Sequence, residues 1–106
     1  MIEVVYSRKH NSVTVKGHAY SGENGHDLVC ASASILVYTL ASFVENMKNA
    51  GQESEPFIVV EEGNAWIEVD PHFKHKPAIT LVFDSICAGF ELLARDYPDN
   101  ISYEIV

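Results

Sequence analysis

Valines alternate with polar residues near the start of the chain, as a half-buried strand requires. Within residues 12–18, valine alternates with Thr14 and Lys16, and residues 2–7 are also rich in β-branched side chains. Successive side chains of a strand point to opposite faces of the sheet, so alternate residues share one environment. The polar residues 8–11 separate the two stretches. We therefore predict a β-hairpin from these two segments.

A long apolar run then follows a loop-like segment of Gly, Ser and Asn that extends from Tyr20 to Gly25. The run covers residues 28–48 without proline or glycine, Asp27 is a favourable N-cap, and Gly51 is a typical helix-ending residue. The pattern predicts a helix with apolar side chains almost all the way round, and hence a central one. These side chains are Val29, Ile35, Leu36, Val37, Leu40, Phe43, Val44 and Met47.

The second half of the chain repeats this arrangement. Residues 56–70 indicate two strands joined by a turn at Gly63-Asn64. A second helix follows the segment 71–77 and ends before Pro98, and residues 101–106 indicate a last strand. The helix has one apolar stripe at three- and four-residue steps, which consists of Ile79, Val82, Phe83, Ile86, Phe90, Leu93, Ala94 and Tyr97.

The expected order of elements is therefore β-β-α-β-β-α-β. Adjacent hairpins favour a largely antiparallel β-sheet, and the two helices would pack on it, so the predicted fold class is α+β. A length of 106 residues is close to the commonest domain size. We expect a single domain over residues 1–106.

Charge and cysteine usage narrow the environment and the partners. Fifteen acidic against seven basic residues give a net charge of −8, which disfavours direct nucleic-acid binding and favours basic partners, or serves solubility alone. The longest apolar run, residues 28–44, contains three serines and is shorter than the ~20 residues of a membrane helix. With no secretory signal pattern at the N-terminus, we expect a cytoplasmic protein with no membrane association and two free thiols, Cys30 and Cys87.

One short segment brings together residue types that carry chemistry. If Asp27 is the N-cap, Cys30 is the third helical residue, where unpaired backbone N–H groups favour a thiolate and could hold an oxyanion. His18 lies twelve residues earlier, and Gly22 and Gly25 would let the intervening loop bring it to the thiol. A Cys–His pair is the minimum for nucleophilic catalysis. The alternative is a structural cysteine with an unrelated histidine.

Two other kinds of site are less favoured by the spacing. A metal site would use His18, His26, Asp27 and Cys30, with His72 and His75, but these residues match no compact ligand spacing, and we predict no metal and no cofactor. A redox pair would need Cys87 as the second thiol. Cys87 lies beside the apolar stripe of the second helix, where cysteine usually acts as a small buried apolar residue.

The segment resembles the signature of the bacterial ribosomal-processing cysteine proteases. The matching residues are "GHA" at 17–19, a Gly25-x-Asp27 step, and "LVCASAS" at 28–34, with its serine four residues after the cysteine. The resemblance implies an endopeptidase that removes a short N-terminal extension from a large-subunit ribosomal protein, after an aromatic residue. It also implies a homodimer.

The resemblance assigns roles to individual residues. His18 and Cys30 correspond to the catalytic pair, and Asp27 and Ser34 to supporting residues of the motif. Apart from the resemblance, the position of Tyr20 after His18 and the glycines Gly22 and Gly25 predict a substrate loop. His26, at a variable position of the motif, is a second histidine that could act as the base. The competing hypothesis is a non-enzymatic, ribosome-associated binding module that holds a basic protein on its acidic surface.

Overall fold

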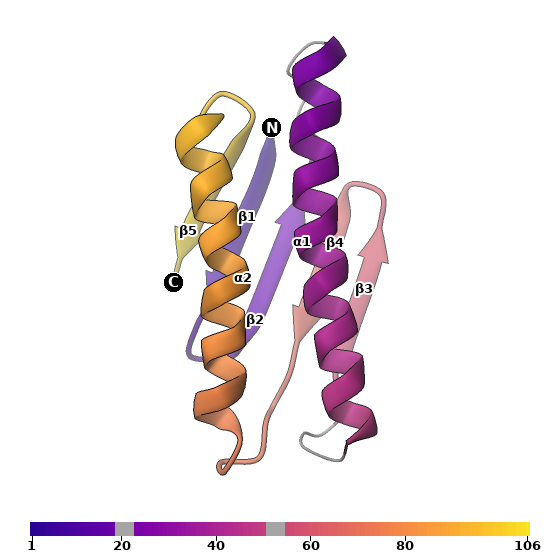
Figure 1. The fold of residues 1–106 in the computed structure, drawn as a ribbon, viewed down its shortest axis with the longest axis vertical. Coiled ribbons are helices and arrows are strands. Elements are labelled where there is room, and N and C mark those ends of the chain that lie inside the picture. Colours follow the sequence, from indigo (N-terminus) through magenta and orange to yellow (C-terminus); the bar gives the residue numbers. More distant parts are fainter. Residues whose placement is uncertain (19–22, 51–54) are drawn as a thin grey trace.

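The computed structural model describes residues 1–18, 23–50 and 55–106, with the backbone alone over 23–27. The described chain forms the elements in the predicted order (Figure 1). The strands are β1 (Ile2–Ser7), β2 (Ser12–Lys16), β3 (Phe57–Glu61), β4 (Asn64–Glu68) and β5 (Ile101–Ile105), and the helices are α1 (Glu23–Asn49) and α2 (Lys76–Asp96).

The strands form one sheet in the order β3-β4-β2-β1-β5. The pairs β1–β2, β2–β4 and β3–β4 are antiparallel, and β5 adds to β1 in parallel. Both helices lie on the same face of this sheet, side by side (Figure 1). The predicted α+β fold with a largely antiparallel sheet and two packed helices is confirmed.

The core lies between the two helices and the covered face of the sheet. Alternate residues of β1 point into it, and the predicted stripe of α2 supplies Phe83 and Phe90, as the three-to-four spacing requires. The largest fully buried apolar side chains are Tyr6, Phe83, Phe90, Leu40, Ile67, Ile79, Ile101, Val4, Val29 and Val44.

The turn of the β3–β4 hairpin lies one residue earlier than predicted. Glu61 pairs with Asn64, so the two turn residues are Glu62 and Gly63, and Asn64 belongs to β4. Gly63 adopts a φ of +72°, which costs glycine little because it has no Cβ. Gly63 and Asn64 are both typical turn residues. Asn64 belongs to the strand and not to the turn because it pairs with Lys16 of β2.

Helix α1 begins earlier than predicted. Its first residue is Glu23, not Leu28, so Gly25 and Asp27 lie inside the helix, and the assignment of Asp27 as the N-cap is wrong. A glycine inside a helix costs about 1 kcal/mol relative to alanine, but it does not break the helix as proline does. The packing of the long apolar segment that follows outweighs this cost.

The prediction that α1 is a central helix is also wrong. Val37, Leu40 and Val44 are buried, but Leu28, Ile35 and Tyr38 are 53%, 60% and 58% exposed. The sheet covers one side of α1 and α2 covers a flank, so the remaining side faces outward. We call the residues Leu28, Ala31, Ile35 and Tyr38, which recur at three- and four-residue steps along this side, the outer stripe of α1.

Both helices are long and apolar enough to cross a membrane by length and composition alone, over Leu28–Asn49 and Lys76–Asp96. The expectation from the sequence, that the longest apolar run is too short for a membrane helix, is therefore wrong as far as length is concerned. In the structure, however, Leu40 and Phe83 belong to one shared core with the strands. This is the packing of helices in a layered α+β domain.

Candidate active site

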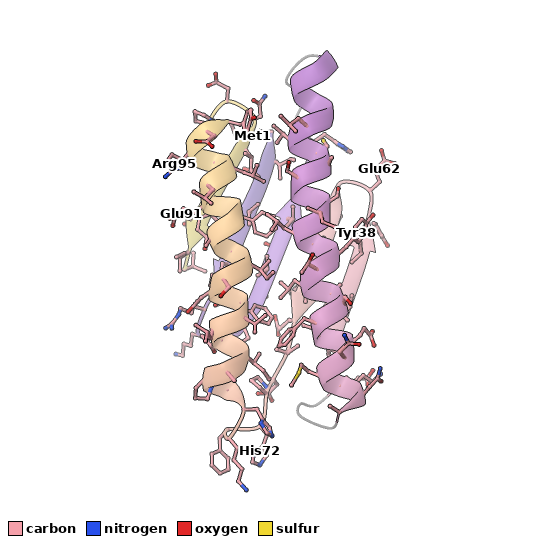
Figure 2. The ribbon with its side chains drawn as sticks, viewed as in Figure 1. Met1, Tyr38, Glu62, His72, Glu91 and Arg95 are labelled. Carbon is pink, nitrogen blue, oxygen red and sulfur yellow. The ribbon has the colours of Figure 1, made fainter. Side chains whose placement is uncertain are left out.

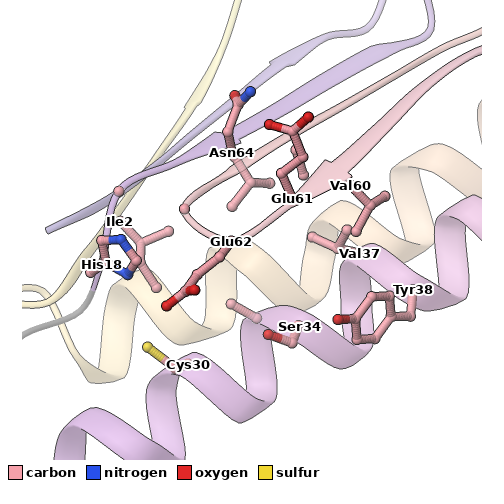
Figure 3. Close-up of a pocket in the computed structure, with 15 residues that line it drawn as sticks. Ile2, His18, Cys30, Ser34, Val37, Tyr38, Val60, Glu61, Glu62 and Asn64 are labelled. Atoms are coloured by element: carbon pink, nitrogen blue, oxygen red, sulfur yellow. The ribbon is translucent and has the colours of Figure 1, made fainter.

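A cavity of about 380 Å³ opens between the first half of α1, the end of β2 and the β3–β4 turn (Figure 3). Its lining combines apolar side chains, a thiol, an imidazole, a hydroxyl and carboxylates. The lining residues are Ile2, Val15, Gly17, His18, Cys30, Ala33, Ser34, Val37, Tyr38, Val60, Glu61, Glu62, Gly63, Asn64 and Ala65. The two residues that the sequence singles out as a catalytic pair, His18 and Cys30, are both among them.

The backbone at Gly17 directs His18 toward this cavity. Gly17 has a φ of +98°, and its N–H donates a hydrogen bond of 3.0 Å to the carbonyl oxygen of Gly63. A Cβ at residue 17 would collide with the carbonyl oxygen of Met1. Both the backbone angle and the close approach of Met1 therefore require glycine immediately before His18.

The imidazole of His18 lies against the β3–β4 turn. A Cβ built on Gly63 would come within 2.7 Å of its Nε2. The ring is half-buried at this position and faces the cavity (Figure 3). The strand pairing of β2 with β4 thus brings the histidine and the turn together, although they are 45 residues apart in the sequence.

Cys30 reaches the cavity from α1. Its side chain is half-buried and packs beside the apolar core. Because α1 begins at Glu23, Cys30 lies about two turns inside the helix, and its backbone N–H is not one of the first four unpaired groups. The prediction that Cys30 sits at the helix N-terminus, with an oxyanion site formed there, is therefore wrong.

Ser34 and Tyr38 follow Cys30 at four-residue steps on α1, so all three side chains lie along one side of the helix. Both line the cavity, and the motif predicts a supporting role for Ser34. Tyr38 is not among the site residues expected from the sequence, although its four-residue spacing from Ser34 indicates that it lies on the same side of the helix. Glu61 and Glu62 were also missed, because only the tertiary pairing of β4 with β2 brings them to the cavity.

The structure describes the remaining predicted site residues only in part. Tyr20 and Gly22 lie outside the described residues, as do the side chains of His26 and Asp27. Gly25 lies within α1, so its assignment to a substrate loop is wrong. A cap contribution of Asp27 to the helix is excluded by the same helix start.

Cys87 is not part of this cavity. It is buried in the core on α2, and burial raises the pKa of its thiol to about 12. A thiol with so high a pKa stays protonated at neutral pH and is a poor nucleophile. The prediction that Cys87 is a small buried residue is confirmed.

Over the described ranges, no group of three or more His, Cys, Asp and Glu side chains is placed to hold a metal ion. His72 lies at the far end of the molecule from Glu62, which marks the cavity side (Figure 2). A metal site that joins His72 to His18 and Cys30 is therefore incompatible with the fold.

The contents of the cavity suit nucleophilic chemistry. A thiol and an imidazole share one lining, and apolar side chains from β1, β2 and α1 surround them. Such a site can bind an apolar side chain while a nucleophile and a base act beside it. The carboxylates of Glu61 and Glu62 add negative charge to the rim.

Comparison with known proteins supports the same chemistry. The ribosomal processing cysteine protease Prp of Bacillus subtilis is 27% identical over 95% of this chain and 94% of its own. The protein of the same name from Mycoplasma pneumoniae is 29% identical over 98% and 94%. The structure of the S. aureus ribosomal processing protease Prp, in complex with a covalently linked product peptide, matches with a TM-score of 0.70 and 22% identity, over 99% of this chain and 97% of that one.

These similarities extend over nearly the whole chain. A family model described as cysteine protease Prp matches residues 1–102. The matched region contains both helices, strands β1 to β4, the first two residues of β5 and every residue that lines the cavity. The chain therefore belongs to the cysteine protease Prp family.

Proposed function

We propose that this protein is an endopeptidase that removes a short N-terminal extension from a large-subunit ribosomal protein, with Cys30 as the nucleophile and His18 as the base. The observation that carries the proposal is the presence of both side chains in the lining of one cavity. The names of its relatives from B. subtilis and M. pneumoniae, which describe ribosomal processing, support the substrate class.

The proposed reaction has two steps. His18 accepts the proton of the Cys30 thiol, and the sulfur attacks the carbonyl carbon of the scissile peptide bond. His18 then gives the proton to the nitrogen of the departing segment, which leaves an acyl group on Cys30 as a thioester. His18 then takes a proton from water as the water oxygen attacks the thioester carbonyl, and the sulfur of Cys30 leaves and regains that proton from His18, which frees the carboxyl group of the product. The S. aureus Prp structure contains a covalently linked product peptide, which supports a covalent step in the proposed reaction.

Other residues would assist this chemistry. Ser34 lines the cavity one turn after Cys30, where its hydroxyl can donate a hydrogen bond to the substrate. Asp27 keeps its proposed supporting role on the motif alone, and Tyr20 and Gly22 keep their proposed loop roles on their position in the sequence. We assign the base to His18 because it matches the histidine of the motif and lines the cavity that contains Cys30.

The cavity also fits the proposed cleavage after an aromatic residue. Ile2, Val15 and Val37 form an apolar wall that can accept an aromatic side chain. The net charge of −8 would attract a basic ribosomal protein in the cytoplasm, without direct contact to nucleic acid.

The proposed homodimer requires an apolar contact surface, and the outer stripe of α1 is a candidate for it. Ile35 is 60% exposed and Tyr38 is 58% exposed, and exposed apolar groups of this kind often mark association sites. Tyr38 also lines the cavity, so a dimer formed here would adjoin the active site.

Mass spectrometry of purified large-subunit ribosomal proteins tests the proposal. The proteins are incubated with wild-type enzyme, with Cys30→Ala, and with Cys87→Ala as the matched cysteine control. The proposal expects one N-terminally shortened product with wild type and Cys87→Ala and none with Cys30→Ala. If wild type binds a ribosomal protein but leaves its mass unchanged, the binding-module hypothesis replaces this one.

A further inference from the structure

The β3–β4 turn has no room for a side chain at residue 63. A Cβ built on Gly63 would lie 2.7 Å from Nε2 of His18 and 3.1 Å from its Cε1. Non-bonded heavy atoms of this kind prefer separations of about 3.5 Å or more. A side chain at residue 63 must therefore displace either the turn or the His18 ring.

The turn is held in place by the sheet. Its carbonyl oxygen at Gly63 accepts the hydrogen bond from Gly17, and the next residue, Asn64, pairs with both Glu61 and Lys16. To retreat, the turn would have to break this end of two antiparallel ladders. The His18 ring is the far end of a side chain that can rotate about its torsions without breaking a strand ladder, so the ring is the part that yields.

We propose that Gly63 is a positioning residue for His18. Its bare backbone provides the surface on which the imidazole rests, in the cavity that His18 shares with Cys30 (Figure 3). A Cβ at this position moves the ring and slows the proton transfers assigned to it. This inference rests on the proposed function, because it assumes that His18 is the base.

The test separates two effects of a substitution at residue 63: the clash of an added Cβ with His18, and the strain of a side-chain-bearing residue at a positive φ. Gly63→Asn adds a Cβ, but asparagine tolerates the left-handed conformation better than other side-chain-bearing residues. Gly63→Ala adds both the Cβ and backbone strain. Gly89→Ala is the matched control, because its Cβ would lie 2.8 Å from Leu36 in the helix pair, and neither residue lines the cavity.

Two readouts are compared in all variants. The NMR signal of the His18 ring, identified by its loss in His18→Gln, reports the position of the ring, and cleavage of a peptide that contains the proposed junction gives kcat and KM. We expect Gly63→Asn to shift the His18 signal and to lower kcat about tenfold to a hundredfold with little change in KM, since small misplacements of catalytic groups have effects of this size. Gly89→Ala should change neither readout.

The proposal is overturned if Gly63→Asn leaves the His18 signal or kcat at the wild-type value. It is also overturned if Gly89→Ala reproduces both changes, because the effect would then be one of general stability. If the wild-type protein cleaves no peptide, the proposed function fails. In that case the His18 signal alone decides whether Gly63 holds the ring.

Discussion

The backbone N–H of Gly17 donates a hydrogen bond to the carbonyl oxygen of Gly63 at 3.0 Å. This bond connects the residue before His18 to the turn against which the imidazole lies. The histidine is thereby held at its backbone by one glycine and at its ring by the other. The geometry of the site therefore depends on two positions that carry no side chain.

Gly17→Ala should lower both stability and activity. An alanine at a φ of +98° is strained by about 1–2 kcal/mol, and its Cβ would also meet the backbone of Met1. We expect a lower melting temperature and at least a tenfold loss of peptide cleavage. Lys16→Ala, a change at the neighbouring exposed residue, should leave stability within about 0.5 kcal/mol. Wild-type behaviour of Gly17→Ala would show that this backbone does not direct His18.

Cys30 should be the thiol that matters for cleavage. We expect Cys30→Ala and Cys30→Ser to lose cleavage while circular dichroism shows an intact fold, because a half-buried thiol contributes little volume and a hydroxyl is a much weaker nucleophile. Cys87→Ala should remain active but melt at a lower temperature, because it leaves a cavity in the core. Substantial cleavage by Cys30→Ala would end the assignment of the nucleophile.

Tyr6 should make the protein sensitive to alkali. Burial, with a hydrogen bond of 2.8 Å from its hydroxyl to Asp84, raises the pKa of Tyr6 above that of a free tyrosine. A raised folded-state pKa means that the stabilisation is present below the unfolded value of about 10 and is lost as the pH rises beyond it. Tyr6→Phe should cost about 1–2 kcal/mol at pH 7 and show a shallower loss of stability above pH 10. Urea denaturation at each pH gives the free energy of unfolding. An equal loss of this free energy above pH 10 in wild type and Tyr6→Phe would contradict the role of Tyr6.

Asp84 should make the stability of the protein sensitive to acid. The hydrogen bonds from Arg8, at 3.0 Å and 3.1 Å, lower the pKa of the Asp84 carboxyl. A lowered folded-state pKa gives stabilisation that is present above the unfolded carboxyl pKa and is lost as the pH falls through the folded value. In urea titrations between pH 6 and pH 3, Asp84→Asn should therefore lose less stability than wild type. An equal loss in both proteins would show that the ion pair with Arg8 is not responsible.

Charge should accelerate the encounter with a basic protein substrate. Salt screens attraction beyond a Debye length of about 10 Å at 0.1 M, so kcat/KM for a full-length ribosomal protein should fall as salt rises. A short neutral peptide that spans the cleavage junction should respond less. If both substrates show the same salt dependence, the charge of −8 serves solubility only, and recognition depends on the cavity.

The outer stripe of α1 should carry the proposed dimer contact. Ile35→Glu places a charge at a residue of the stripe that is 60% exposed, and we expect it to give a monomer in sedimentation experiments where wild type is a dimer. Leu81→Glu is the matched control, because Leu81 is also an exposed aliphatic residue, at 66%, but lies on α2. A dimer that persists in Ile35→Glu would place the contact elsewhere.

Local sequence patterns determined the elements of this fold. The stripe of α2 and the alternation in β2 depend only on the 3.6- and two-residue periods of helix and strand, so they could be read directly. The family motif likewise identified His18 and Cys30 without any knowledge of their distance in space. The order of elements and the fold class followed from these local signals and the short connections between hairpin strands.

The tertiary structure decided what local periods cannot encode. Apolar residues on every side of α1 do not reveal that the sheet and α2 cover only part of the helix, so Ile35 and Tyr38 remain exposed. The start of α1 at Glu23 depends on the balance between a glycine cost and the packing of the whole helix. The contact of Gly63 with His18 arises from the pairing of β4 with β2, and such long-range register is set by the packing of the sheet rather than by either segment alone.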